Sequence, residues 1–224
     1  MNKISDLVRI DAGANAIFVA EHARYFPRAT YTSMPWRNGA GTTLEIAREP
    51  AQGERFTWRL SLAALQASGP FSSYTGHQRC VALVDGRGFR LHVAGAGTKT
   101  LAARGDHALF AGAAEVSCEL LDGPCTDLSL IVHDPGTIAS VTRLVVSAEH
   151  SVAIPKGQLR VLFALHGAIK CHGFHPSKPA ASSGYSFKLN AHDTLLVHGR
   201  GYSWLISRAS GDVAELLVID FAVA

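Results

Sequence analysis

The sequence predicts an all-β protein made of two similar halves, each a small barrel of packed sheets. From about Tyr31 onward, apolar or alternating runs of four to eight residues are separated by Gly, Pro, Asp, Asn or Ser, which is typical of short strands. Two sequence blocks of the first half recur in the second. The length of 224 residues accommodates two domains of about 100 residues each.

The strands are placed on the apolar and alternating runs, taken in chain order. In the first half they are 44–47, 56–63, 79–84, 89–93 and 108–110. Those that follow are 115–121, 128–132, 141–147, 159–165, 185–189, 194–197, 203–207 and 214–221. Many short strands at this spacing indicate a sandwich or barrel rather than a helical fold.

The repeat is carried by two pairs of segments. Residues 79–86 (RCVALVDG) align with 160–167 (RVLFALHG), and residues 105–112 (GDHALFAG) align with 192–199 (HDTLLVHG). A strand that ends in Gly, a variable hairpin and a Gly-Asp turn into another strand is the layout of a cupin barrel. Two copies predict a bicupin, a pair of tandem jelly-roll barrels, although chance agreement between two β-rich stretches is the alternative.

Three segments follow from the repeat. Residues 28–140 form the first barrel, which we expect to hold a ligand site, and residues 141–224 form the second, which we expect to be a scaffold or a subunit interface in a homodimer. Residues 1–27 lie outside the repeat as an N-terminal extension, either an added strand or a short helix around 16–25.

The composition and charge of the chain indicate which kinds of partner to expect. Apolar residues make up 47% of the chain, which supplies material for two cores, and the charge of +3 arises from scattered side chains without a basic run, so a nucleic-acid partner is not expected. No apolar stretch approaches the roughly 20 residues of a membrane span, and no secretory signal is recognisable. We therefore expect a cytoplasmic protein without a membrane partner, whose four cysteines are buried thiols.

A metal cofactor is not expected. Cupins bind divalent metals through an HxH pair, a nearby carboxylate and a third histidine. Here His92 is followed by Ala94, and His172 and His175 are spaced as HxxH. The ligand set is therefore incomplete, and we predict neither a metal nor another cofactor.

The polar side chains of the first half lie on alternating strands. Glu45 shares a strand face with Thr43 and Ala47, and Arg59 and Ser61 lie opposite the apolar face of residues 56–63. Such a face either is exposed to solvent or points into the interior of a barrel. A carboxylate and a guanidinium on adjacent strands, set among small residues, favour a barrel interior that recognises a small polar ligand.

Three motifs in the first half resemble the HutD/Ves family. They are residues 35–46 (PWRNGAGTTLEI), residues 56–63 (FTWRLSLA) and the pattern GPFSxYxGxxR at 69–79, and the likeness extends over 28–221. It implies a bicupin fold, an association with histidine utilisation, and small-molecule binding or regulation. The sequence departs from the family at Asp127-Leu128-Ser129 and His133, where Asp-Leu-Asn followed by Arg is expected.

The leading hypothesis is therefore a regulatory protein that binds a carboxylate metabolite, such as formylglutamate or another histidine-degradation intermediate. Arg59 and Arg79 would grip the carboxylate as bidentate forks, unless Arg79 is a rim residue like Arg160. The remaining site residues supply apolar walls or bracing (Trp36, Trp58) and hydrogen bonds to an amide or formyl group (Asn38, Glu45, Ser61). The alternative is a metal-independent isomerase or hydrolase with Glu45 as general base.

Overall fold

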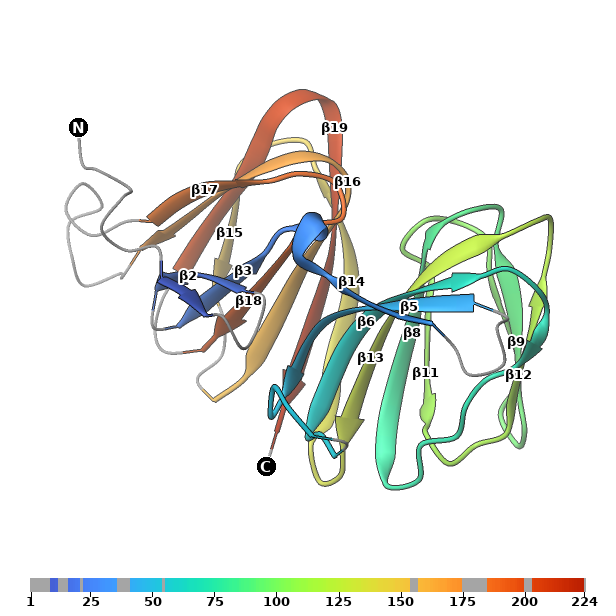
Figure 1. Cartoon of the computed structure of the whole chain (residues 1–224). Coiled ribbons are helices and arrows are strands. Elements are labelled where there is room, and N and C mark those ends of the chain that lie inside the picture. The colour runs from blue at the N-terminus through green and yellow to red at the C-terminus, as the bar shows by residue number, and fades with distance from the viewer. Residues whose placement is uncertain are drawn as a thin grey trace. The chain divides into compact units, whose positions relative to one another are not determined.

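The chain is almost entirely β in its computed structural model, which describes residues 9–11, 16–20, 22–35, 41–53, 55–153, 157–174, 185–199 and 203–223 (Figure 1). Over these residues the one helical element is a 3-10 turn, η2, at Arg28–Thr30. The chain divides into two compact units. We call residues 31–138 the first barrel, and residues 1–30 with 139–222 the second barrel. The predicted all-β, two-barrel class is confirmed.

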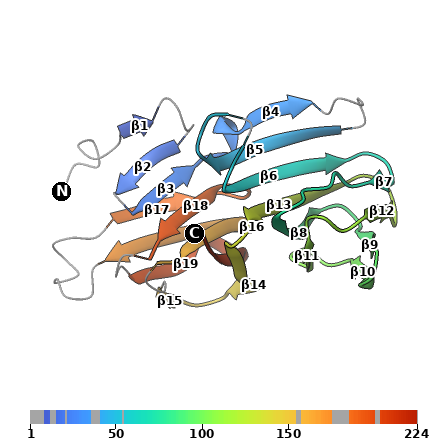
Figure 2. The same cartoon turned by 90° about the horizontal axis from the view of Figure 1, so that it is seen from below.

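The first barrel consists of two sheets, visible as two layers in Figures 1 and 2. In order across the six-stranded sheet, the strands are β11 (His107–Ala111), β8 (His77–Asp85), β13 (Cys125–His133), β6 (Trp58–Leu65), β5 (Gly41–Glu49) and β4 (Thr32–Pro35). The four-stranded sheet consists of β10 (Gly97–Leu101), β9 (Phe89–Val93), β12 (Val116–Leu120) and β7 (Gly69–Pro70).

The core of the first barrel lies between these sheets. Val81 and Leu83 of β8 pack in one buried cluster with Phe89 and Leu91 of β9 and with Val116 of β12. Because alternate residues of a strand share a face, every side chain in phase with Val81 and Leu83 points toward the four-stranded sheet. This inner face is the frame for the site described below.

The second barrel is one nine-stranded sheet that bends along two long strands, β16 (Leu159–Phe174) and β19 (Ser203–Ala222). Its other strands are β1 (Arg9–Asp11), β2 (Ala16–Ala20), β3 (Ala23–Phe26), β14 (Thr137–Val146), β15 (His150–Ala153), β17 (Tyr185–Leu189) and β18 (Thr194–His198). The segment treated above as an N-terminal extension contributes β1, β2 and β3, and β3 pairs with β18. Around residues 16–25 the chain is therefore strand, not helix.

The internal repeat is reproduced in the strand register. Arg79 pairs with Phe110 between β8 and β11, and the residues aligned with them, Arg160 and Val197, pair between β16 and β18. The turns match as well. The amide of Leu83 donates to the carbonyl of Asp106 at 2.9 Å, and the aligned Ala164 donates to Asp193 at 3.0 Å. The sequence match is therefore a structural repeat rather than chance agreement.

The turn before the second repeated strand needs a left-handed backbone in both barrels. Gly105 has φ +84° in the first barrel, and the aligned His192 has φ +68° in the second. Glycine adopts this conformation without steric cost, whereas histidine is tolerated there only when its surroundings hold it. The ring of His192 stacks on Phe163 at a centroid distance of 5.9 Å and an interplanar angle of 11°.

Some predicted strand limits are wrong in an informative way. The predicted strands 203–207 and 214–221 are one strand, β19, and the predicted strand 159–165 continues to Phe174. Register shifts between Ala164 and His166, and again on either side of Ala168, let the paired strands bend without ending. The strand β10 escaped prediction because four of its five residues are exposed and show no apolar alternation.

Candidate functional site

A row of polar side chains crosses the inner face of the first barrel. Glu45 of β5 pairs directly with Ser61 of β6, which pairs with Ser129 of β13. Ser129 in turn pairs with the core residue Val81 of β8, so the row shares the inner face with the core. Ser61 is 2% exposed and Ser129 is 6% exposed. The polar strand face predicted from the sequence is therefore turned inward, not toward solvent.

Two arginines flank Ile131 on this inner face. Arg59 of β6 and Arg79 of β8 each pair with Ile131 of β13, one from either side. The Cζ atoms of Arg59 and Arg79 lie 5.4 Å and 5.3 Å from the centre of the Tyr74 ring. Arg59 Nη2 also donates to the Tyr74 hydroxyl at 2.8 Å. The Tyr74 ring thus connects two like-charged groups.

Further aromatic rings enclose the guanidinium groups. Arg79 lies over Phe71 and Phe110 at 5.2 Å and 5.3 Å, and its Nη1 donates to the Ser72 carbonyl at 2.9 Å. Phe56 lies between Arg59 at 5.2 Å and Arg48 at 5.4 Å. Cation–π contacts of this kind hold the charges without neutralising them. We call Arg48, Arg59 and Arg79, with these rings and that of Tyr74, the arginine cluster.

Arg48 belongs to this cluster because of a bulge in β5. Up to Glu45 the pairing with β6 is regular, but the register shifts between Glu45 and Ala47. Arg48 is then opposite Arg59, and Ala47 is opposite Leu60. The prediction that Ala47 shares the face of Glu45 is therefore wrong, because one extra residue inverts the alternation that follows it.

The Tyr74 loop is held by Gly112 at the end of β11. The Tyr74 amide donates to the Gly112 carbonyl and the Gly112 amide donates to the His77 carbonyl, each at 2.7 Å. A Cβ at residue 112 would meet the carbonyl oxygens of both Tyr74 and His77, the latter at 2.8 Å. Glycine is therefore required here for close backbone approach, and it sets the position of the Tyr74 ring.

Asp127 lies on the same inner face, opposite Leu83 and within the electrostatic reach of Arg79. It is 1% exposed, and its Oδ1 has no hydrogen-bond partner among the described residues. Burial raises the pKa of Asp127 to about 7, against the opposing pull of Arg79. Burial likewise lowers the pKa of Arg79, and Asp127 opposes that shift.

The cluster therefore has more positive than negative charge. Glu45 is the nearest ion partner of Arg48, at 4.0 Å from Oε2 to Nη1. Asp127 is only partly ionised near neutral pH, because its pKa is about 7. Counting the described residues, three guanidinium groups in an aromatic, partly buried setting then face little more than one carboxylate charge. Such an arrangement favours an anion, and Arg forks match the two oxygens of a carboxylate.

The structure brings together four of the predicted site residues: Glu45, Arg59, Ser61 and Arg79 share the inner face. Arg79 is 7% exposed and so is not a rim residue. Trp58 is 1% exposed and lies on the opposite face of β6, so it braces the strand and does not line the cluster. Trp36 and Asn38 lie outside the described residues.

Sequence reasoning missed Arg48, Tyr74, Asp127 and Ser129. A β-bulge has no recognisable signature in the local sequence, so the position of Arg48 opposite Arg59 could not be predicted. Asp127 and Ser129 alternate with Leu128 and Leu130 in the same manner as Arg59 and Ser61 alternate with Leu60 and Leu62. That alternation was the available signal for an inward polar face on β13.

Among the described residues, no group of three or more His, Cys, Asp and Glu side chains is arranged to hold a metal ion. His92 instead shares hydrogen bonds with Thr98 Oγ1 at 3.0 Å and Glu119 Oε2 at 3.2 Å. His175 lies outside the described residues.

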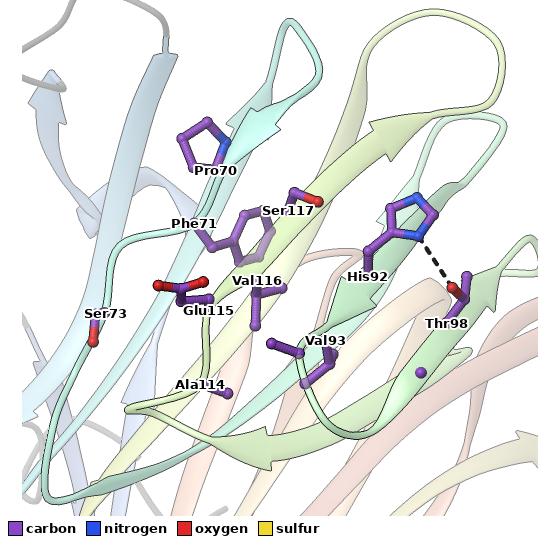
Figure 3. Close-up of a pocket in the computed structure, with 12 residues that line it drawn as sticks. Pro70, Phe71, Ser73, His92, Val93, Thr98, Ala114, Glu115, Val116 and Ser117 are labelled. Atoms are coloured by element: carbon purple, nitrogen blue, oxygen red, sulfur yellow. Dashed lines mark hydrogen bonds between the residues drawn. The ribbon is translucent and has the colours of Figure 1, made fainter.

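A cleft of about 670 Å³ is lined by residues from all four strands of the four-stranded sheet and from the loops beside them (Figure 3). Figure 3 shows Phe71 beside Val116 and Ser117, and His92 hydrogen-bonded to Thr98. Among the predicted site residues that the structure describes, none lines the cleft. Its connection to the arginine cluster is Phe71, whose ring lines the cleft and also stacks against Arg79.

Two jelly-roll barrels in tandem, one with a polar inner face, define a bicupin. Within that class, the chain belongs to the HutD family, whose model matches residues 28–214.

Solved structures support this assignment. A conserved protein of unknown function from Pseudomonas aeruginosa PAO1 is 30% identical, with 90% of this chain and 100% of that chain covered and a TM-score of 0.78. HutD from Pseudomonas fluorescens SBW25, solved in a formate condition, is 27% identical, with 90% and 99% covered and a TM-score of 0.69. An oxalate decarboxylase from Lactobacillus farciminis, 9% identical with a TM-score of 0.62 over 92% of this chain and 87% of that chain, shows the shared fold alone.

Two curated relatives match over shorter stretches. An uncharacterized 21.2 kDa protein in the hutC 3' region of Pseudomonas putida is 43% identical over 102 residues, which is 45% of this chain and 53% of that protein. Protein Ves of Citrobacter koseri is 37% identical over 97 residues, 43% of this chain and 50% of that protein. The chain spans about half the length of these relatives. In the described part of the chain, no helix has the length and apolar character to cross a membrane.

Proposed function

We propose that the first barrel binds a small carboxylate metabolite at the arginine cluster, and that the protein thereby acts as a regulator in histidine utilisation. The observation that carries the proposal is a difference between the two copies of the repeat. Arg79 and Arg160 are equivalent, but Arg160 forms an ion pair with a carboxylate, whereas Arg79 forms none with any of the described residues.

The second barrel supplies that carboxylate from β19. Arg160 pairs with Asp220 across β16 and β19, and its Nε and Nη2 donate to the two carboxylate oxygens, each at 2.6 Å. The Ser140 hydroxyl donates to the same carboxylate at 2.9 Å. This is the bidentate geometry in which arginine binds carboxylate most strongly.

In the first barrel the corresponding cross-strand partner of Arg79 is Ile131. An aliphatic side chain accepts no hydrogen bond, so the fork of Arg79 is directed at aromatic rings and one backbone carbonyl. A ligand carboxylate beside Ile131 would supply what Asp220 supplies in the second barrel. Arg59, on the other side of Ile131, would reach the same ligand.

The rest of the ligand is expected to be polar. The row of Glu45, Ser61 and Ser129 continues from the arginines along the inner face, and Glu45 Oε2 and Ser129 Oγ have no hydrogen-bond partner among the described residues. An amide or formyl group would satisfy such donors and acceptors. Formylglutamate combines carboxylates with a formamide, and the formate condition of the Pseudomonas fluorescens relative makes formate the smallest probe to test.

The direct test is calorimetric titration of formylglutamate, glutamate and formate into the wild type and Arg59→Gln. Because hydrogen bonds between charged groups contribute about 1.5–3 kcal/mol each, we expect Arg59→Gln to weaken binding by roughly tenfold or more. Arg87→Gln is the matched control, since that side chain is 78% exposed on a hairpin of the same barrel. Absence of binding by all three compounds, or equal affinity in Arg59→Gln, would refute the proposal.

The regulatory part needs a cellular measurement. A strain carrying Arg59→Gln should respond to added histidine with altered expression of its histidine-degradation genes, whereas Arg87→Gln should behave as wild type. Conversion of a bound compound to a product, lost in Glu45→Gln, would instead make the first barrel an enzyme with Glu45 as general base.

A further inference from the structure

A second cleft lies on the outer face of the second barrel, away from the core of that barrel. It measures about 460 Å³ and is formed on four neighbouring strands in the order β17, β16, β19 and β15. Its lining includes Lys170, Lys188, His172, Ser186 and Ser207. Cys171 and Ile206, which alternate with these residues, belong to the buried core. The polar lining therefore points outward.

Two lysines face each other across this cleft. Lys170 of β16 and Lys188 of β17 are direct cross-strand partners, and both are exposed. Like charges in directly opposite positions of an antiparallel pair destabilise the sheet. Among the described residues, no carboxylate lies within ion-pair distance of Lys170 or Lys188. The pair is therefore an uncompensated concentration of positive charge.

Hydroxyl groups and an imidazole surround the two ammonium groups. Ser207 of β19 pairs with Lys170, and Ser186 pairs with His172 at the next outward position. The Nδ1 of His172 and the Ser186 hydroxyl share a short hydrogen bond of 2.6 Å. Donors from three neighbouring strands thus line the cleft.

Among the described lining residues one is acidic, Glu149, and it lies toward the opposite side. It precedes β15, whose first residue His150 pairs with Ile206. Extending this register by one residue sets Glu149 beside Ser207, two strands from Lys170, a backbone separation of about 10 Å. Glu149 forms no ion pair with either lysine in the described part of the chain, and outside contact distance an exposed carboxylate cancels little of the lysine charge in water.

We infer that this cleft is an anion site for a phosphate group, either inorganic phosphate or a phosphomonoester. Two ammonium groups match the charge of a phosphate near neutral pH, and the hydroxyls and the imidazole suit its additional oxygens better than they suit a carboxylate with two. A volume of about 460 Å³ also leaves room for an organic group attached to the phosphate. The site is independent of the ligand proposed for the first barrel.

Thermal unfolding and calorimetry with phosphate and with glycerol phosphate test the inference, each against sodium chloride at equal ionic strength. We expect saturable binding of phosphate over chloride, at least tenfold weaker in Lys188→Gln and lost in Lys170→Gln/Lys188→Gln. Lys99→Gln, which removes an exposed lysine from β10 of the first barrel, should bind as wild type does. Tighter binding of glycerol phosphate would identify the organic ester as the preferred source of the phosphate.

Two controls separate the loss of phosphate binding from unfolding and from binding at the first barrel. Without phosphate, Lys188→Gln should melt at the same temperature as wild type or higher because the lysine repulsion is removed, so lost binding would not reflect unfolding. The response should persist in Arg59→Gln, which separates it from the first barrel. Equal responses to phosphate and chloride, or unchanged phosphate affinity in Lys170→Gln/Lys188→Gln, would overturn the inference.

Discussion

Arg79 lies directly opposite Ile131 across strands β8 and β13, on the inner face of the first barrel. At the equivalent position of the second barrel, the partner of Arg160 is the carboxylate of Asp220. The two barrels thus share an arginine at equivalent positions. Asp220 neutralises the charge of Arg160, whereas the residue opposite Arg79 is an uncharged isoleucine.

Ile131→Asp should close the proposed carboxylate site from within. The introduced carboxylate would pair with Arg79 as Asp220 pairs with Arg160, and it would repel an anionic ligand. We expect at least a tenfold loss of affinity for carboxylates by calorimetry. The control is Ile131→Asn, because the Asn side chain has nearly the same shape as Asp but no charge. Equal binding by the two variants would contradict the prediction.

Asp220→Ala should destabilise the protein strongly, because it leaves Arg160 without its charge partner. The Arg160 and Asp220 side chains are 12% and 11% exposed. Loss of one partner from such a pair costs about 3 kcal/mol. Asp122→Ala breaks the ion pair with Arg87, whose side chains are 68% and 78% exposed, and should cost less than about 1 kcal/mol. Urea denaturation of both variants measures the difference, and similar losses would refute it.

Stability should fall as pH rises toward neutrality because of Asp127. Its pKa is about 7 in the folded protein, whereas an unfolded Asp titrates near about 4. Between these values the folded state binds more protons than the unfolded state, so the free energy of unfolding declines with rising pH and levels off above about pH 7. The full effect is at most about 4 kcal/mol.

Denaturation of the wild type and Asp127→Asn at pH 5 and pH 8 measures this contribution. The amide cannot titrate, so the variant should lose less stability than the wild type between the two values. Other titrating groups contribute to both proteins and cancel in the comparison. Parallel pH profiles would show that Asp127 is ionised in the folded state well below pH 7.

Carboxylate binding should take up protons near pH 7. An anion beside Arg79 offsets the positive charge that favours the Asp127 carboxylate and therefore shifts Asp127 toward its neutral form. Because the pKa of Asp127 is about 7, about half of the Asp127 side chains are already protonated at that pH, so the uptake should be measurable but at most about half a proton per ligand. Calorimetry in two buffers of different ionisation enthalpy reports this number directly. It should vanish in Asp127→Asn, and equal uptake by the two proteins would assign the proton to another group.

Gly112→Ala should weaken the first barrel and displace Tyr74. The added methyl group would press on the carbonyl oxygens of Tyr74 and His77, which are backbone atoms that cannot rotate away. We expect a loss on the order of 2 kcal/mol in urea denaturation, together with weaker carboxylate binding. Gly69→Ala is the control, since a Cβ there has nothing within 4 Å. Equal stability of the two variants would contradict this account of Gly112.

The positions of many strands along the chain followed from the local sequence pattern. The runs at 79–84 and 89–93 became β8 and β9 because each alternates or is wholly apolar between turn residues. Strand limits were less predictable where the chain bends. The strand β19 passes through Gly211 without ending, and no local signal distinguishes this from the turn that the glycine suggests.

The candidate site was likewise predictable from the sequence only in part. Alternation in 56–63 separated Arg59 and Ser61 from the apolar Leu60 and Leu62, but it could not say which of the two faces is enclosed. Only the pairing of β6 with β13 and β8 answers that, because it places Ser61 in register with the core residue Val81. Arg48 needed the bulge, which depends on how β5 pairs with β6.

The sequence by itself determined that this protein is built from two related β halves and that polar residues concentrate on alternating positions of the first. Both properties are periodic or local, and a chain displays them before it folds. The tertiary structure decided which face points inward, that Asp127 is buried within the electrostatic reach of Arg79, and that Asp220 rather than a residue like Ile131 meets Arg160. These depend on pairings between residues far apart in the chain, where a shift of one position changes every partner.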